Sequence, residues 1–466
     1  MLFCLTVPVQ GEDTAEAAVA VSPPTAETET DRALALFHDA MDSLRTNYVG
    51  QVDEVALTET ALKAMLATLD GHSTYLTPKE FKSFGENAKG VFGGVGAVVE
   101  VVGGGPRIIS PVDGGPLARL GVGPGWKIVQ IDGVETSGFI LNDVTSKLRG
   151  TPGTKVTVIF SDLKNKLVTM EITRELINIQ SVYHRSIGTT GYLRVTGFDQ
   201  KTGKEFTEAA KAMAKSKGLT GVIIDLRNNA GGSLDSAILM SSALLKKGDM
   251  IVRGGKSAAD SGAATVQTDG DVFNSLPIVL LINGGSASAS EVVAGALQDN
   301  HRATLVGLPS FGKGLVQTVF PLDKGERGAV IVTTMRYYSP SGRSIQKTGI
   351  LPDLVVARSA EEARQVVGAA VIFSEATLAH APDNESGEMR QPVEKVEGPL
   401  PGSGPEKASL LFATPLPSDA DIAADFQIQR ALDVLKFGSV AVAQKERPAK
   451  IFLRKTTSPD APPVLK

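Results

Sequence analysis

"PIVLLINGGSASASEVVAGALQDN", Pro277 to Asn300, is the stretch that decides the fold. An unbroken apolar run up to Ile282 predicts a buried strand, and after a Gly-Gly turn small hydroxyl residues begin an amphipathic helix. A strand that passes directly into a helix is the repeating unit of layered α/β domains. Reacting groups in such domains collect where the strands end, so the same stretch indicates where a functional site would lie.

The alternation of strand and helix continues on both sides of this stretch, from about residue 190 to residue 356. Short apolar strands are predicted at 191–198, 221–227, 277–284 and 303–308, and helices at 204–216, 234–245 and 289–299. Parallel strands need crossover connections, which helices usually supply. The sequence therefore predicts a layered α/β core with a largely parallel sheet.

The regions outside the core differ from it in composition and in the spacing of their apolar residues. From Asp31 to about Leu69 apolar residues recur at helical spacing, which predicts an α-helical hairpin. From Gly90 to about Thr173 short β-type runs between Gly and Pro residues predict a small, separate β-rich domain with one helix. Near the C-terminus, a Pro- and Glu-rich linker precedes a last amphipathic helix at 425–437.

These differences divide the 466 residues into five predicted parts of a multidomain α/β protein. They are a leader or disordered segment at 1–31, a helical region at 32–88, the β-rich domain at 89–175, the α/β core at 176–358, and a C-terminal part at 359–466 whose linker covers about 382–408.

Charge and cysteine content exclude several classes of function. Lys and Arg total 47 against 51 for Asp and Glu, a net charge of −4, and no long basic block attracts nucleic acid or anionic lipid. The single cysteine, Cys4, lies in the leader, so the body of the chain cannot use disulfides, cysteine metal sites or a cysteine nucleophile. Small molecules and proteins remain as partners.

The first residues leave two interpretations open. "MLFCLTVPVQ" is apolar but too short to span a bilayer, and "AVA" at 18–20 resembles a signal-peptidase site. A disordered N-terminus and a clipped export signal both fit this pattern.

A serine in the deciding stretch is a candidate nucleophile. It would lie at the top of the sheet with a helix N-terminus behind it, whose amides can stabilise an oxyanion. Ser286, Ser288 and Ser290 compete for this role, and periodicity does not choose among them. The structural alternative is a capping box formed by Ser288 and Glu291, in which the serine only caps the helix.

A serine nucleophile needs a base, and Lys313 is the candidate. None of the five histidines lies in a recognisable triad setting, whereas Lys313 follows the next strand on the glycine-flanked loop "GLPSFGKG", residues 307–314. The loop resembles a phosphate-binding P-loop, but Gly314 stands where that motif needs Ser or Thr. Burial would make the amine neutral enough to act as base, and Gln317 would aim it. An ordinary surface lysine is the alternative.

Two glycine-rich turns complete the candidate site residues. In "GVIIDLRNNAGGSLDSA" a buried strand ends at Asp225, and Gly231 and Gly232 would expose amides toward the same cleft, unless they only form a tight turn. In "GVFGGVGAVVEV", from Gly90, a similar loop precedes a strand of the β-rich domain and can receive the terminal carboxylate of a peptide.

Together these motifs resemble the carboxyl-terminal processing proteases, also called tail-specific proteases, over most of residues 32–356. The motifs that carry the resemblance are "GHSTYLTPKEF", "FGGVGAVVE", "DLRNNAGG", "NGGSASASEVVAGALQD", "GLPSFGKGLVQ" and "TTMRYYSPSGRSIQKTGILPD". The resemblance implies a serine–lysine dyad of Ser288 and Lys313, with Gln317 orienting the lysine. It also implies an oxyanion hole from the amides of Gly232 and Ala289, and a PDZ peptide site at Gly93, Gly94, Val95 and Gly96.

The resemblance further implies a crotonase- or ClpP-like core with an inserted PDZ domain and acyl-enzyme chemistry that needs no metal or cofactor. Implied partners are proteins with accessible C-terminal tails, an adaptor protein, and further copies of this chain joined through terminal helices. The implied location is the periplasm or cell envelope. The rival function is a catalytically silent PDZ scaffold. The sequence departs from the family pattern at Gly71, Ala230 and Trp126.

Overall fold

The computed structural model describes residues 28–454, except for 103–104, 113–114, 124, 140, 179, 256–261, 267–269, 368–373, 379 and 400–415. The chain divides into two compact units, residues 1–61 and 62–466. In the first unit, helix α1 (Glu29–Asn47) begins at a capping box of Thr28 and Asp31, and none of its residues is buried. Helix α2 (Glu54–Ala67) follows, so both predicted helices are present. The predicted leader, as far as residue 27, lies outside the described residues.

A six-stranded sheet forms the centre of the second unit. Its strands lie in the order β10, β11, β12, β15, β16 and β19, and all neighbours are parallel except β10 and β11. Their bounds are Val182–Ile187, Thr190–Val195, Gly221–Asp225, Ile278–Ile282, Ala303–Gly307 and Leu354–Val355. The predicted largely parallel sheet is confirmed, and its four predicted strands are β11, β12, β15 and β16.

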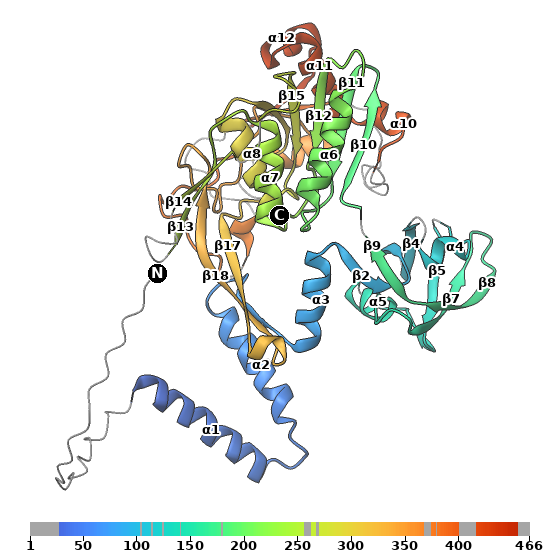
Figure 1. Ribbon diagram of the computed structural model, residues 1–466, viewed down its shortest axis with the longest axis vertical. Helices are drawn as coiled ribbons and strands as arrows, with labels where there is room; N and C mark the ends of the chain where they lie inside the picture. Colours follow the sequence, from blue (N-terminus) through green and yellow to red (C-terminus); the bar gives the residue numbers. More distant parts are fainter. Residues whose placement is uncertain are drawn as a thin grey trace, which may run out of the picture. The chain divides into compact units, whose positions relative to one another are not determined.

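Helices cover both faces of this sheet (Figure 1). On one face, Leu280 and Ile282 of β15 belong to the apolar core that includes helices α6 (Thr202–Ala214), α7 (Leu234–Leu244) and α8 (Ala289–Asp299). On the other, Val279 and Leu281 pack in a second core with helix α11 (Phe426–Phe437). Successive side chains of a strand point to opposite faces, so a strand buried on both sides reads as the unbroken apolar run seen in the sequence.

A second, antiparallel sheet adjoins the residues that follow β16. Its long strand β18 pairs with the whole of β17 on one side and with β1 and β13 on the other, and β14 extends the sheet beyond β13. Their bounds are β1 Thr74–Leu76, β13 Asp249–Gly255, β14 Gly262–Thr265, β17 Leu315–Pro321 and β18 Ala329–Tyr338. Helix α3 (Pro78–Ala88) follows β1. The strand β17 begins two residues after Lys313, so the sheet fixes one end of that loop.

The β-rich domain has its own apolar core, and the strands predicted for it are present as β3, β4, β5 and β7. Trp126 is partly buried and packs against this core, with its ring edge-on to Phe160 at 6.1 Å between centroids. The bounds are β2 Val91–Gly94, β3 Ala97–Val102, β4 Gly105–Pro111, α4 Pro116–Arg119, β5 Lys127–Ile131, β6 Val134–Glu135, α5 Leu141–Leu148, β7 Lys155–Ser161, β8 Leu167–Thr173 and β9 Glu175–Asn178.

The segment predicted as a linker at about 382–408 differs from that prediction over residues 382–399. Asn384 donates to the carbonyl of Gln346 at 3.1 Å, and Nε of Arg390 donates to the carbonyl of Thr348 at 3.0 Å. Val396 is fully buried. Low apolar content indicated disorder, but polar side chains fix this segment to loops of the core instead. Residues 400–408 lie outside the described part.

Of the remaining elements, the 3₁₀ turn η2 (Asp323–Gly325) lies between β17 and β18, and the others belong to the C-terminal part of the chain. These others are α9 (Ala360–Val366), the 3₁₀ turn η3 (Glu375–Thr377), β20 (Lys395–Gly398), α10 (Asp419–Ala424), α12 (Val440–Glu446) and β21 (Lys450–Leu453). Within the described ranges, no helix combines the length and the apolar character needed to cross a bilayer.

A buried ion cluster fixes α11 to the turn after β12. The guanidinium of Arg227, at 2% exposure, donates to Asp225 at 2.6 Å, to Asp425 at 2.7 Å and to Gln427 at 2.8 Å. Asp425 also caps α11 by accepting from the amides of Gln427 and Ile428. Arg227 therefore binds Asp225 of its own turn together with two residues at the start of the C-terminal helix.

We expect Asp425→Ala to lower the free energy of unfolding by about 3 kcal/mol or more, because it leaves a buried guanidinium with fewer anionic partners and removes a helix cap. The matched control is Asp419→Ala, which breaks the ion pair with Arg185 at a carboxylate that is 91% exposed. This exposed pair contributes less than about 1 kcal/mol. Urea unfolding of both variants measures the difference. Equal losses would contradict a special role for the buried cluster.

Candidate active site

A cavity of about 640 Å³ lies at the carboxyl ends of the parallel strands. Phe198, Gly232, Ser288 and Lys313 border it, and they follow β11, β12, β15 and β16 respectively. Gln317 and Tyr337 border it from the second sheet, and Ala289 from the start of α8. The structure therefore brings together Ser288, Lys313, Gln317, Gly232 and Ala289, as the sequence predicted for this edge of the sheet.

Ser288 occupies an unusual backbone conformation between β15 and α8. Its φ is 55° and its ψ is −113°, outside the regions that non-glycine residues normally adopt. The neighbouring turn approaches closely, since a Cβ added at Gly231 would lie 2.9 Å from Cβ of Ser288 and 2.6 Å from the carbonyl oxygen of Ala287. Strained residues of this kind cluster at functional sites. The close approach explains why glycine stands at 231.

The structure separates the three candidate serines. The hydroxyl of Ser286 donates to the carbonyl of Leu226 at 2.8 Å, and that of Ser290 donates to the carbonyl of Asn229 at 2.8 Å. Both serines are fully buried and hold the turn together, whereas Ser288 is half-buried and borders the cavity. The capping box is also present, since Glu291 accepts from the amide of Ser288 at 2.8 Å. Capping and a place in the cavity are therefore compatible.

Lys313 borders the same cavity from the loop between β16 and β17. Burial lowers the pKa of its amine, while the carboxylates of Glu375, Glu291 and Asp70 act against that shift. Among the described residues the amine forms neither a hydrogen bond nor an ion pair within the protein. The loop packs tightly, because a Cβ added at Gly314 would lie 2.7 Å from the amide nitrogen of Gln346. Lys313 is thus a partly desolvated lysine and not a freely solvated one.

Two backbone amides border the cavity beside Ser288. Gly232 has a φ of 135°, and a Cβ added there would lie 2.0 Å from the carbonyl oxygen of Phe198. In the described part of the chain, neither the amide of Gly232 nor that of Ala289 donates to a protein acceptor. Ala289 is the first residue of α8, where helix geometry leaves the amide without an intrahelical partner. Both amides remain available to a ligand oxygen.

Gln317 borders the cavity, but its contact differs from the expected one. Its side-chain nitrogen donates to the hydroxyl of Thr333 at 3.1 Å across the β17–β18 pair. Within the described residues it forms no hydrogen bond with Lys313. The pairing of β17 with β18 explains this, because it places Thr333 opposite Gln317.

Three further residues were not predicted from the sequence: His72 and Tyr337 border this cavity, and Glu375 contacts His72. Nε2 of His72 lies 2.8 Å from Oε1 of the fully buried Glu375, and Gln346 donates to the same oxygen at 3.1 Å. The hydroxyl of Tyr337 donates to the carbonyl of Ser288 at 3.1 Å and also contacts the carbonyl of Lys313. His72 and Tyr337 lie within quoted motifs, which was a signal for their position. Glu375 lies outside every motif, and no local pattern identifies it.

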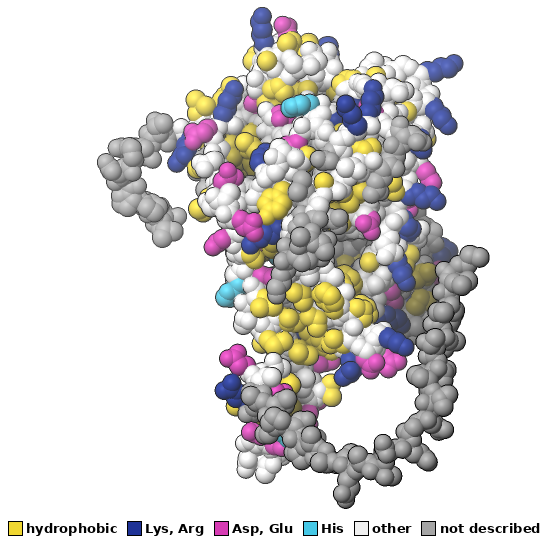
Figure 2. All heavy atoms as spheres, turned by 60° about the vertical axis from the view of Figure 1, so that its left-hand side comes forward, with side chains coloured by type: hydrophobic (Ala, Val, Ile, Leu, Met, Phe, Trp, Pro, Cys, Tyr) yellow, Lys and Arg dark blue, Asp and Glu magenta, His cyan; other side chains and the backbone are white. Residues whose placement is uncertain are grey.

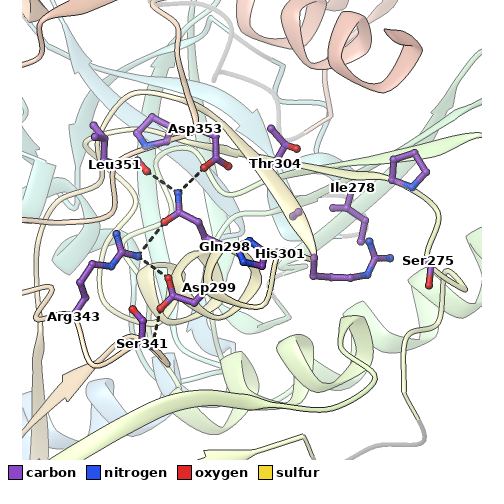
Figure 3. Close-up of a pocket in the computed structure, with 14 residues that line it drawn as sticks. Ser275, Ile278, Gln298, Asp299, His301, Thr304, Ser341, Arg343, Leu351 and Asp353 are labelled. Atoms are coloured by element: carbon purple, nitrogen blue, oxygen red, sulfur yellow. Dashed lines mark hydrogen bonds and ion pairs between the residues drawn. The ribbon is translucent and has the colours of Figure 1, made fainter. Parts of the chain in front are cut away.

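A larger cavity, of about 990 Å³, lies at the other end of α8 (Figure 3). Its polar side chains bind one another: Gln298 donates to Asp353 at 3.0 Å, and Arg343 donates to Gln298 at 3.1 Å and to Asp299 at 2.9 Å. These mutual bonds brace the loop after β18 against α8. The cavity at Ser288 is therefore the better candidate for chemistry.

The glycine-rich loop of the β-rich domain also differs from expectation. Gly93 and Gly94 belong to strand β2, which pairs with β9, and only Val95 and Gly96 form the bend before β3. The carbonyls of Val95 and Gly96 accept from the amides of Leu117 and Val112. The hydrophobic side chain of Val95 is buried in the domain core.

Comparison with known proteins assigns the chain to a family. The profile described as peptidase family S41 matches residues 189–356. A carboxy-terminal-processing protease from Bartonella bacilliformis is 42% identical over 334 residues, which cover 71% of this chain and 76% of the relative. The carboxy-terminal processing protease CtpA of Bacillus subtilis is 32% identical over 317 residues, which cover 68% and 67%.

One solved structure in the comparison is a photosystem II D1 C-terminal processing protease. It shares 29% sequence identity and a TM-score of 0.44, and the match covers 72% of this chain and 91% of that one. On the sequence relationships, this chain belongs to peptidase family S41, among the carboxy-terminal processing proteases.

Proposed function

We propose that this chain is a serine endopeptidase that cleaves proteins bearing accessible C-terminal tails, with Ser288 as nucleophile and Lys313 as general base. The observation that carries the proposal is that a strained serine and a desolvated lysine border one cavity. A lowered lysine pKa is what general-base catalysis near neutral pH requires. The family supports peptidase activity, and the dyad is our assignment within it.

The proposed reaction uses only groups of this chain and water. The neutral amine of Lys313 accepts the proton of the Ser288 hydroxyl as Oγ bonds to the scissile carbonyl carbon. The oxyanion that forms accepts from the amides of Gly232 and Ala289. Collapse of this intermediate breaks the peptide C–N bond, and the lysine returns the proton to the leaving amine. Water then hydrolyses the acyl-enzyme by the same steps.

We expect Ser288→Ala and Lys313→Met each to lower kcat/KM by about 10⁴-fold or more, because each removes a group that reacts in the transition state. Cleavage of an unstructured protein, followed by gel electrophoresis and mass spectrometry, measures the loss. His72→Ala is the informative comparison, since His72 is the other basic side chain at the cavity. Full activity in Lys313→Met together with loss in His72→Ala would transfer the role of base to the histidine.

The same assay tests the rival function. Absence of turnover by the wild-type protein, with candidate adaptors present, would favour a silent tail-binding scaffold over a peptidase.

The pH dependence follows from the lowered pKa of Lys313. Burial favours the neutral amine, so the active base appears at a lower pH than an exposed lysine would allow. We expect kcat/KM to increase as pH rises through this lowered pKa and to be lost as pH falls below it. A rate that stays flat, or that decreases over the same alkaline range, would be incompatible with a neutral lysine base.

We expect Gly232→Ala to lower kcat by about 100- to 1,000-fold, because the new Cβ would displace the turn that carries one oxyanion donor. The matched control is Gly188→Ala. Gly188 also has a positive φ, 57°, but no atom lies within 4 Å of an added Cβ. Steady-state kinetics of both variants measure the effect. An unchanged kcat in Gly232→Ala would show that this amide is not part of the oxyanion hole.

We propose that the β-rich domain is a PDZ domain that receives the substrate tail. The bend at Val95 and Gly96 between two strands supports this, since such loops can bind a terminal carboxylate while a strand edge pairs with the peptide. Titration of the Ser288→Ala protein with a peptide that has a free carboxylate, against its C-terminal amide, tests it. Equal affinity for both peptides would contradict carboxylate recognition.

We further propose self-association through the N-terminal helices. Leu34, Leu36, Phe37 and Leu44 of α1 remain exposed, although such residues are usually buried. Figure 2 also shows an apolar area on one face of the molecule, with acidic and basic side chains intermingled elsewhere on that face, but the proposal rests on the exposed side chains of α1 alone. Sedimentation measures the oligomeric state of the full chain and of the chain without residues 1–47. A monomeric full chain would contradict the proposal.

A further inference from the structure

The carboxylate of Glu291 connects the main chains on both sides of the cavity. Glu291 is fully buried, and its oxygen Oε2 accepts from the amide of Ser288 at 2.8 Å and from the amide of Lys313 at 2.9 Å. The other oxygen, Oε1, accepts from the hydroxyl of Ser310 at 2.6 Å and from the amide of Gly312 at 2.6 Å. One oxygen atom is thus shared by the backbones of the two residues assigned to the dyad.

Tyr337 connects the same two residues through their carbonyls. Its hydroxyl donates to the carbonyl of Ser288 at 3.1 Å and contacts the carbonyl of Lys313. Burial raises the pKa of Tyr337 well above its usual range, so the hydroxyl remains a donor. Glu291 and Tyr337 together bind the amide and the carbonyl of both residues.

We propose that Glu291, assisted by Tyr337, is a positioning residue that fixes the Ser288 hydroxyl relative to the Lys313 amine. This inference rests on the proposed dyad and names what sets its geometry. Ser288 follows one strand and Lys313 the next. The amide of Phe311 also joins the two loops, because it donates to the carbonyl of Ser286 at 2.9 Å, but that bond does not act on Ser288 or Lys313 themselves. A displacement of about 1 Å between reacting groups can lower a rate by about 100-fold. A capping role alone requires only the bond to Ser288, so the bonds to Lys313, Gly312 and Ser310 call for a further explanation.

The charge of Glu291 determines whether this arrangement can form. Four donors point at the carboxylate, and a protonated carboxyl group would present one O–H to donors that need acceptors. Burial raises the pKa of Glu291 to about 7, although the four hydrogen bonds favour the ionised form. The partly buried guanidinium of Arg390 and the Lys313 amine are the nearby positive groups, while Tyr337 and Glu375 also face this region. The positioning contacts are therefore complete above a pH of about 7.

The test is Glu291→Gln, which keeps the side-chain shape but replaces one acceptor oxygen by a donor. We expect kcat to fall by about 10- to 100-fold with little change in KM, because substrate contacts remain while the dyad is displaced. The wild-type pH–rate profile should contain a step near pH 7, from the pKa of Glu291, in addition to the lysine step. In Glu291→Gln the step near pH 7 should disappear and the lysine step should remain.

The matched control is Glu397→Gln. Glu397 is also buried, accepts from Nε of Arg430 at 2.9 Å, and lies on β20 away from the cavity. It should change stability without removing the step near pH 7. A generic effect of losing a buried carboxylate would instead alter both profiles alike, and that result would overturn the inference.

A second variant covers the case in which Glu291→Gln does not fold. Tyr337→Phe removes a single hydroxyl, and we expect kcat to fall by about 3- to 10-fold at unchanged KM, as for one lost hydrogen bond. Circular dichroism and thermal unfolding verify the fold of each variant. Wild-type kcat in a folded Glu291→Gln, or in Tyr337→Phe if that variant alone folds, would overturn the positioning role. Failure of the dyad itself is separate, since Ser288→Ala and Lys313→Met would then remain active in the same assay.

Discussion

Desolvation of the Lys313 amine is the constraint on which the proposed chemistry depends. A lysine in water has a pKa of about 10.4 and is almost entirely protonated near neutral pH, so it cannot accept a proton from serine. Burial in the cavity lowers this pKa, whereas the carboxylates of Glu375, Glu291 and Asp70 act to raise it. The site therefore balances two demands: the loop needs a buried carboxylate to hold it in place, and the base needs little negative charge around it.

Two sheets together position the residues that surround the lysine. The parallel sheet delivers Gly232, Ser288 and Lys313 at the carboxyl ends of neighbouring strands, and the antiparallel sheet closes the cavity with Gln317 and Tyr337. The C-terminal segment contributes as well, although it lies beyond the region matched by the family profile at 189–356. Through Glu375 and Arg390 it contacts the loops around the lysine, and through Asp425 it braces the turn that carries Gly232.

Local patterns in the sequence were enough to predict the elements of the core. The strand before Ser288 and the helix after it are apolar on the faces that they bury, so their periodicity is visible without a structure. Periodicity did not choose Ser288 over Ser286 and Ser290, and only the structure shows that the two alternatives are held by bonds to carbonyls of another turn. For the dyad, motif resemblance supplied the assignment that periodicity alone left open.

Contacts between distant segments could not be predicted from local patterns. His72 and Glu375 are 303 residues apart, and no local pattern pairs them. Residues 382–399 contain few apolar side chains, yet Asn384 and Arg390 fix them to the core by hydrogen bonds. Glu291 fits a capping box as predicted, but its bonds to the lysine loop appear only when the two strand ends meet.

The pKa of Lys313 in the folded protein most directly tests whether this lysine can act as a neutral base. It can be measured from the pH dependence of the lysine side-chain ¹³Cε resonances, with Lys313 assigned by the Lys313→Arg variant. We expect one lysine resonance that titrates clearly below the usual lysine pKa and is absent from the variant. A Lys313 resonance that titrates at or above the usual lysine pKa would contradict it.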